Sequence, residues 1–215
     1  VSKSDFSAIG FACMQSGGDL SRLASLCSPE TASKIQIGGD WKLLPWVRSN
    51  NGIEAPKNPT VDTTFLSMHF SEWNSLLRMT LSSIKRQESV VIIPRRLEEV
   101  DSFRNELRDQ ELLVVEWPLV QKGAVSLVSR YGQTFEVLSK SKTAVVGGSF
   151  ARTLGVHDFW EPLQLGVSTC VGPYSHGHKS TVDALVREGV LSQLRSTADY
   201  AKRDLPDIRL VKTFL

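Results

Sequence analysis

The sequence predicts an α/β fold: a doubly wound, mainly parallel, Rossmann-like sheet with helices on both faces. Short β-rich runs alternate with amphipathic stretches along the chain. Several runs, such as residues 90–93 and 144–146, are continuously apolar, which is typical of parallel strands covered on both faces. Hydrophobic residues make up 41% of the 215 and charged residues 22%, so a sizeable core is available.

The beginning of the chain predicts a strand over residues 9–13, a helix over 19–26 and a strand over 34–37. The helix follows a Gly-Gly pair and opens on Asp19, an acidic residue that suits a helix N-terminus. Residues 43–62 contain three prolines and a glycine and form the one long irregular stretch. We interpret this stretch as a loop within a single domain spanning residues 1–215.

The middle of the chain predicts strands over residues 63–68 and 89–93, each followed by a helix. The first helix, over residues 70–86, has apolar side chains at a spacing of three to four residues. This stripe consists of Trp73, Leu76, Leu77, Leu81 and Ile84. The second, over residues 97–110, carries Val100, Phe103 and Leu107 on one face and an acidic first turn, which suits the helix dipole.

The remaining elements continue the alternation. The predicted strands are residues 112–116, 124–128, 143–146 and 168–171. The predicted helices are residues 133–141, 158–165, 179–187 and 191–202.

Composition excludes several classes of function. Lys and Arg total 25 against 23 Asp and Glu, for a net charge of +2, so we expect no nucleic-acid partner. No apolar run reaches the ~18–20 residues of a membrane span. The three cysteines are widely spaced, which predicts free thiols, and His176 and His178 have no Cys or acidic companion at ligand spacing, so neither a metal nor a cofactor is expected.

In a doubly wound fold the ligand lies beyond the carboxyl ends of the strands. Gly147 and Gly148 follow one predicted strand, Arg95 follows another, and a helix begins near Asp158. Backbone amides, a helix N-terminus and an arginine together predict an anion cradle. Glu161, one turn into that helix, suits vicinal hydroxyls such as those of ribose, so the pattern outlines a nucleotide site.

Each of these features also has a simpler interpretation. The glycine pair can be a tight turn, and Arg95 a solvated charge. His69 and His157 can be core or helix-capping residues, and Glu161 before a proline is ordinary first-turn chemistry.

Seven segments resemble, in family order, motifs of the C-terminal half of bacterial Kdo transferases. These GT-B glycosyltransferases move 3-deoxy-D-manno-oct-2-ulosonic acid (Kdo) from CMP-Kdo onto a lipid A precursor. The matching segments are residues 14–16 (family AQS), 39–42 (GNLK), 67–72 (STHxGE), 93–96 (VPRH), 145–149 (FVGGS), 155–162 (GGHNxxEP) and 172–174 (GPH).

The resemblance implies a donor-binding domain, one half of a GT-B fold. The residues implied for the nucleotide are Pro94, Arg95, Tyr131, Gly132, Gln133, Asp158, Phe159, Trp160 and Glu161. Those implied near the phosphate and sugar are Gly147, Gly148, Ser149, His157, His69 and Lys42. The implied partners are CMP-Kdo or a similar nucleotide sugar and, through an N-terminal half absent from this chain, a lipid A precursor.

The family reaction inverts the anomeric centre without a metal, and its general base is a glutamate of the N-terminal half. We therefore expect no catalytic residue in this chain and no activity from it alone. The chain opens on Val1, which favours a processed or excised piece. The full-length protein is expected on the cytoplasmic side of the inner membrane, and this fragment is expected to be soluble.

Several positions depart from the family motifs. Asp158 replaces an asparagine, Val156 a glycine, Arg96 a histidine and Tyr174 a histidine. Two alternatives therefore stay open: a non-catalytic binding or regulatory module of GT-B ancestry, and a related GT-B protein that uses a UDP-sugar.

Overall fold

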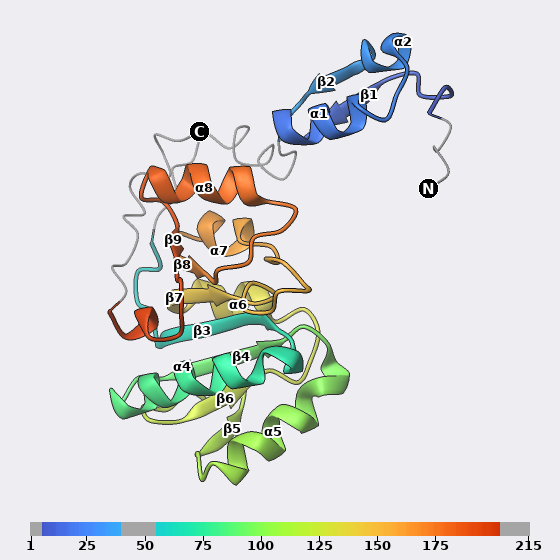
Figure 1. The fold of residues 1–215 in the computed structure, drawn as a ribbon. Coiled ribbons are helices and arrows are strands. Elements are labelled where there is room, and N and C mark those ends of the chain that lie inside the picture. Colours follow the sequence, from blue (N-terminus) through green and yellow to red (C-terminus); the bar gives the residue numbers. More distant parts are fainter. Residues whose placement is uncertain (1–5, 40–54, 203–215) are drawn as a thin grey trace. The chain divides into compact units, whose positions relative to one another are not determined.

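The computed structural model describes residues 6–39 and 55–202, which fall into two compact units, Val1–Asn50 and Asn51–Leu215 (Figure 1). Each unit is described by itself. The sequence predicted a single domain over residues 1–215, and that expectation stays a prediction.

The N-terminal unit is a small strand–helix–strand arrangement. Strand β1 (Ala12–Met14) pairs in parallel with β2 (Ile35–Ile37), and helices α1 (Gly17–Ala24) and α2 (Pro29–Ala32) connect them. The hydroxyl of Ser16 accepts from the amide of Asp19 and so caps α1. Sequence analysis missed α2, although a serine followed by proline and an acid is a recognisable helix start.

The larger unit contains a seven-stranded sheet in the order β5-β6-β4-β3-β7-β8-β9. All of its strand pairs are parallel, which confirms the predicted fold class. The strands are β3 (Val61–Met68), β4 (Val90–Pro94), β5 (Val114–Glu116), β6 (Val125–Leu127), β7 (Ser141–Val146), β8 (Ser168–Val171) and β9 (Ser192–Gln193).

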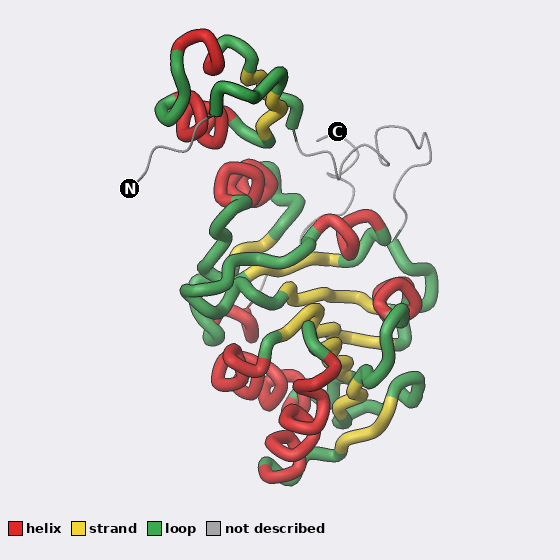
Figure 2. Tube along the Cα trace, turned by 90° about the vertical axis from the view of Figure 1, so that its right-hand side faces the viewer, coloured by secondary structure: helices red, strands yellow, loops and turns green. Residues whose placement is uncertain are grey.

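Helices cover both faces of this sheet. Helices α4 and α5 lie on one face, and α6 and α7 lie on the other (Figures 1 and 2). The helical elements are η2 (Phe70–Glu72), α4 (Trp73–Lys85), η3 (Leu97–Glu99), α5 (Val100–Asp109), α6 (Thr134–Ser139), α7 (Trp160–Gln164), α8 (Lys179–Arg187) and the 3-10 turn η4 (Asp199–Lys202). This two-sided cover follows because the chain leaves β3 and β7 in opposite directions, and right-handed crossovers then place the helices on opposite faces.

One cluster of the apolar core lies between the sheet and helices α4 and α5. Phe65 and Ile92 from the sheet, with Met79 and Phe103 from the helices, are fully buried there. Trp73, which is partly buried, packs against the same cluster. The apolar stripes predicted on both helices therefore face the sheet, as their spacing requires.

The predicted helix over residues 191–202 is wrong. This segment contains β9, a turn and η4. Leu191 and Leu194 are buried at a helix-like spacing, but they flank a short strand that pairs with β8. Tyr200 is fully buried, and its hydroxyl is hydrogen bonded to Ser83 at 2.7 Å and donates to Thr63 at 3.0 Å. Pairing and tertiary packing therefore override the local pattern.

The predicted irregular stretch, residues 43–62, needs one correction. Its last residues, Val61 and Asp62, begin β3, and residues 40–54 lie outside the described part of the chain. Asp62 forms a clamp at the amino ends of the central strands. Its carboxylate accepts from the backbone and hydroxyl of Ser89, both at 2.9 Å, and from Lys142 at 2.7 Å and Lys122.

Candidate functional site

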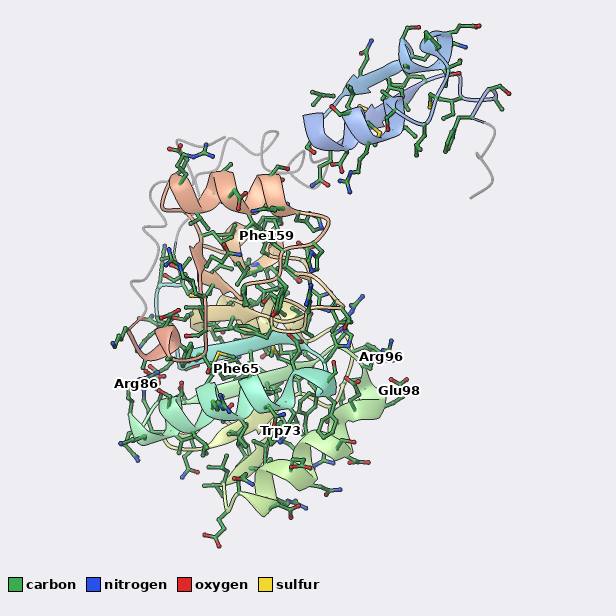
Figure 3. All side chains as sticks on the ribbon, viewed as in Figure 1. Phe65, Trp73, Arg86, Arg96, Glu98 and Phe159 are labelled. Carbon is green, nitrogen blue, oxygen red and sulfur yellow. The ribbon has the colours of Figure 1, made fainter. Side chains whose placement is uncertain are left out.

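The direction of the sheet connections reverses between β3 and β7. These strands are neighbours, but the chain continues from β3 to β4 on one side and from β7 to β8 on the other. Doubly wound folds bind ligands beyond the carboxyl ends of the strands at such a reversal. We use the word crevice below for the region beyond the carboxyl ends of β3, β4 and β7. Figure 3 shows Arg96, just after β4, at the end of the sheet opposite Arg86.

Two histidines from distant parts of the chain meet in this crevice. His69 directly follows β3, and His157 lies in the loop after β7. Their Nε2 atoms are 2.7 Å apart, and their ring centroids are separated by 4.9 Å. His69 is buried and His157 half-buried. At this distance one Nε2 donates a proton and the other accepts it.

The environment of His157 disfavours its protonated form. Burial is the largest cause, and the charges of His69 and Arg95 add to it, so the pKa of His157 is lowered to about 4. The imidazole of His157 is therefore neutral at pH 7 in the ligand-free protein. Because Arg95 contributes to this shift, its exposed guanidinium acts on the crevice from the end of β4.

Both glycines of the Gly147-Gly148 turn are needed for close packing around these histidines. A Cβ on Gly147 would lie 2.4 Å from the carbonyl oxygen of Ser67, and one on Gly148 would lie 2.2 Å from that of Gly155. Gly148 also has a φ of +73°, a conformation that favours glycine. The two glycines thus allow the loop after β7 to pack against the end of β3.

The amides of this turn donate to the protein itself. The N–H of Gly147 donates to the carbonyl of Leu66 at 2.7 Å. The buried carboxylate of Glu72 accepts from Gly148 at 2.8 Å, Phe150 at 2.9 Å and His69 at 3.1 Å, all through backbone N–H groups. The expectation that the Gly-Gly amides themselves cradle an anion is therefore corrected, because a carboxylate already occupies that position.

Glu72 is a structural residue whose role sequence analysis missed. It appeared only as part of the motif over residues 67–72. Its position three residues after His69 is the available signal, because an acid at that position can accept from the amide of the residue that precedes the helix. By bonding the backbones that follow β3 and β7, it holds the two loops of the crevice together.

The first backbone amide of α7 is also hydrogen bonded within the protein. The carboxylate of Asp158, which precedes the N-cap residue Phe159, accepts from the amide of Trp160, the first residue of this short helix, at 3.0 Å. Phe159 and Trp160 are buried, with exposed fractions of 1% and 2%, and Phe159 packs edge-on against His178. The side chains of Phe159 and Trp160 therefore serve the core, and Asp158 and the half-buried Glu161 are the more accessible members of this segment.

Ser149 links the loops that follow β7 and β8. Its buried hydroxyl donates to the carbonyl of Val146 and accepts from the amide of Gly172 at 2.7 Å. Its own carbonyl accepts from the amide of Tyr174 at 3.0 Å. Ser149 therefore positions the Gly172-Pro173-Tyr174 segment.

The remaining predicted residues lie as follows. Pro94 is the buried end of β4. Tyr131 is 77% exposed, Gly132 has a φ of +79°, and Gln133 caps α6. Lys42 lies outside the described residues. The roles predicted for all these residues in nucleotide binding stay predictions.

Residues 6–39 and 55–202 contain no metal-binding cluster and no membrane-spanning helix. No group of three or more His, Cys, Asp or Glu side chains is arranged to hold a metal ion. No helix in these ranges is long and apolar enough to cross a bilayer.

Comparison with curated proteins finds two 3-deoxy-D-manno-octulosonic acid transferases. The one from Aquifex aeolicus is 28% identical over 127 residues, which are 59% of this chain and 34% of that protein. The one from Chlamydia pneumoniae is 25% identical over 205 residues, 88% of this chain and 45% of that protein. The chain thus spans less than half the length of these relatives, and no family model matches it.

Among solved structures, the chain is similar to the C-terminal CMP-Kdo binding domain of WaaA from Acinetobacter baumannii. The TM-score is 0.56 at 21% identity, and the match covers 74% of this chain and 81% of that domain. This likeness confirms the predicted fold as a GT-B half. Together with the two curated relatives, it confirms the resemblance to the C-terminal half of Kdo transferases.

Proposed function

We propose that this chain is the donor-binding half of a Kdo transferase-like glycosyltransferase and that it binds CMP-Kdo. The observation that carries the proposal is the convergence of three segments beyond the carboxyl ends of β3, β4 and β7. There, segments resembling three family motifs, around His69, Arg95 and His157, converge from distant parts of the chain. The similarity to a CMP-Kdo binding domain supports the same ligand class.

Within this crevice we assign the phosphate to Arg95. Its guanidinium is exposed, and it makes no side-chain hydrogen bond or ion pair with the residues that the structure describes. It is therefore available for a charge-assisted bond to a phosphate oxygen. Glu161, in the first turn of α7, is assigned to the ribose hydroxyls. Tyr131, Gly132 and Gln133 are assigned to the nucleoside.

The proposed reaction is inverting transfer of Kdo to a lipid A precursor on the cytoplasmic side of the inner membrane. The bond between the anomeric carbon and the phosphate oxygen breaks, and CMP leaves with one more negative charge. This half would stabilise that charge electrostatically. The acceptor and the general base belong to the other half, so we expect no transfer by this chain alone.

Calorimetric titration of the chain with CMP, with UMP as the matched ligand, tests the proposal. Micromolar to low-millimolar binding of CMP that UMP does not match supports a cytidine-nucleotide donor. Equal or tighter binding of UMP would favour the UDP-sugar alternative. Binding of neither nucleotide would contradict donor binding by this chain and favour the non-catalytic module.

A further inference from the structure

We propose that the His69–His157 pair takes up one proton when a phosphate occupies the crevice beside Arg95, so that nucleotide binding is linked to proton binding. This inference rests on the proposed function and adds a proton-holding site to it. It starts from the juxtaposition of two imidazoles from segments 88 residues apart.

The geometry leaves a place for the proton. The two rings share one hydrogen bond between their Nε2 atoms, at 2.7 Å. Among residues 6–39 and 55–202, neither ring makes another hydrogen bond. In the neutral pair, the ring that donates through Nε2 therefore carries a lone pair on Nδ1.

Protonation at that Nδ1 keeps the existing hydrogen bond. The added proton makes the donating ring an imidazolium, which still donates through Nε2 to its neutral partner. The pair then carries one positive charge in total, and both Nδ1 atoms carry protons. The product of this step is thus a cationic donor pair in the crevice.

The groups around the pair disfavour a proton on His157 before a ligand arrives. Burial disfavours a proton on His157 most, and the charges of His69 and of Arg95, at the end of β4, have the same effect. The carboxylate of Glu72 is bonded to three backbone N–H groups, including that of His69 itself. Asp158, next to His157, bonds to the amide of Trp160. His176 lies next to Gly155, and its ring is hydrogen bonded to the carbonyl oxygen of Arg152.

A bound phosphate changes this balance. Its negative charge offsets that of Arg95, and a nearby opposite charge favours the protonated imidazole. A phosphate monoester such as CMP carries close to two negative charges at pH 7.5. The phosphate diester of an intact nucleotide sugar carries one. The pair therefore favours the departing nucleotide over the intact nucleotide sugar, which places it where charge develops during the reaction.

Proton uptake is measured by titrating the chain with CMP in buffers of different ionisation enthalpy at pH 7.5. We expect uptake approaching one proton per CMP, and affinity that falls up to tenfold per pH unit above pH 7.5. The methyl ester of CMP, with a single negative charge, is the matched ligand and should take up fewer protons. The variants His157→Gln and His69→Gln should each abolish the uptake, whereas His176→Gln should not.

Each outcome decides one of the two proposals. CMP binding with no proton uptake, or uptake that persists in both folded variants of the pair, overturns the proton-linked site but leaves the donor-binding function standing. If CMP does not bind, the donor-binding function fails, and inorganic phosphate becomes the probe. Phosphate binding with uptake that His157→Gln removes would then uphold the histidine pair, and its absence would overturn it. Thermal unfolding of each variant shows whether it is folded.

Discussion

At the scale of single residues, the site depends on a few side chains whose neighbours leave them available. Arg95 is one of these, because its backbone is fixed while its side chain is exposed. Its amide donates to the carbonyl of Met68 at 2.8 Å, which ties the end of β4 to the end of β3. The backbone of Arg95 is thus fixed beside the end of β3, while its guanidinium is exposed.

Replacing Arg95 tests its role directly. The change Arg95→Ala should weaken CMP binding by about 1.5–3 kcal/mol, the value of a charge-assisted hydrogen bond to phosphate. Calorimetry measures this loss. The matched control is Arg108→Ala, an exposed arginine in the last turn of α5, which should leave the affinity unchanged. Equal affinity of Arg95→Ala and the wild type would remove Arg95 from the site.

Glu161 is tested by the hydroxyl it is expected to bind. The change Glu161→Gln should weaken CMP by about 1–2 kcal/mol, because the carboxylate is a stronger acceptor for a ribose hydroxyl than the amide oxygen. Binding of 2′-deoxy-CMP should change much less, since it lacks one of the two hydroxyls. Parallel titrations with both ligands check this expectation, and an equal loss for both would reject the ribose role.

At the scale of the elements, the two ends of the parallel strands have different tasks. The carboxyl ends carry the crevice, and the amino ends carry the Asp62 clamp, which joins β3, the start of β4 and β7 through Ser89 and Lys142. Burial opposes ionisation of Asp62, but hydrogen bonds from Lys122, Lys142 and Ser89 outweigh it and hold its pKa well below the ordinary value. The ionised carboxylate therefore stabilises the folded state.

The clamp predicts a specific pH dependence of stability. The change Asp62→Asn should lower the free energy of unfolding by about 2–3 kcal/mol at pH 7, because it weakens several charge-assisted bonds. The folded-state pKa lies below the unfolded value of about 3.9, so this contribution is fully present above pH 5 and declines as the pH falls below about 4. The gap between wild type and variant should therefore narrow toward pH 3.

Denaturant unfolding at pH 7, 5 and 3 measures that gap. The control is Asp183→Asn, whose carboxylate forms an exposed pair with Lys179 on α8 and should contribute about 0.5 kcal/mol or less. A gap that is constant from pH 7 to 3 would show that Asp62 acts through packing and not through its charge.

Local patterns predicted most of the elements but not the contacts between them. The apolar runs around residues 90–93 and 144–146 are buried on both sides, so their strands were evident from the sequence. The two-residue strand β9 was not, because Leu191 and Leu194 have helical spacing and only pairing with β8 decides otherwise. In an element this short, the local sequence pattern is weaker than the effect of pairing with a neighbouring strand.

At the scale of the whole molecule, parallel topology explains why the site was partly predictable. Residues after successive parallel strands share one edge of the sheet, so His69, Arg95 and His157 were expected on the same side. The sequence did not predict the order of the strands, and this order decides which loops are in contact. The 2.7 Å contact between His69 and His157 and the bonds of Glu72 to Gly148 and Phe150 depend on β3 lying beside β7.

The division into two units gives a prediction for the whole chain. Every described residue assigned to the nucleotide lies within residues 55–202, and so does the core that supports it. A chain shortened to residues 55–215 should therefore fold cooperatively and bind CMP within about threefold of the full chain, since a threefold change is only about 0.65 kcal/mol. Calorimetry on both chains, with Lys42→Ala in the full chain as the matched variant, checks this.

A tenfold or greater loss on shortening would place part of the site in residues 1–54. If Lys42→Ala reproduced that loss, the lysine predicted near the phosphate would be its source. If Lys42→Ala had no effect, other residues of 1–54 would be the source of the loss.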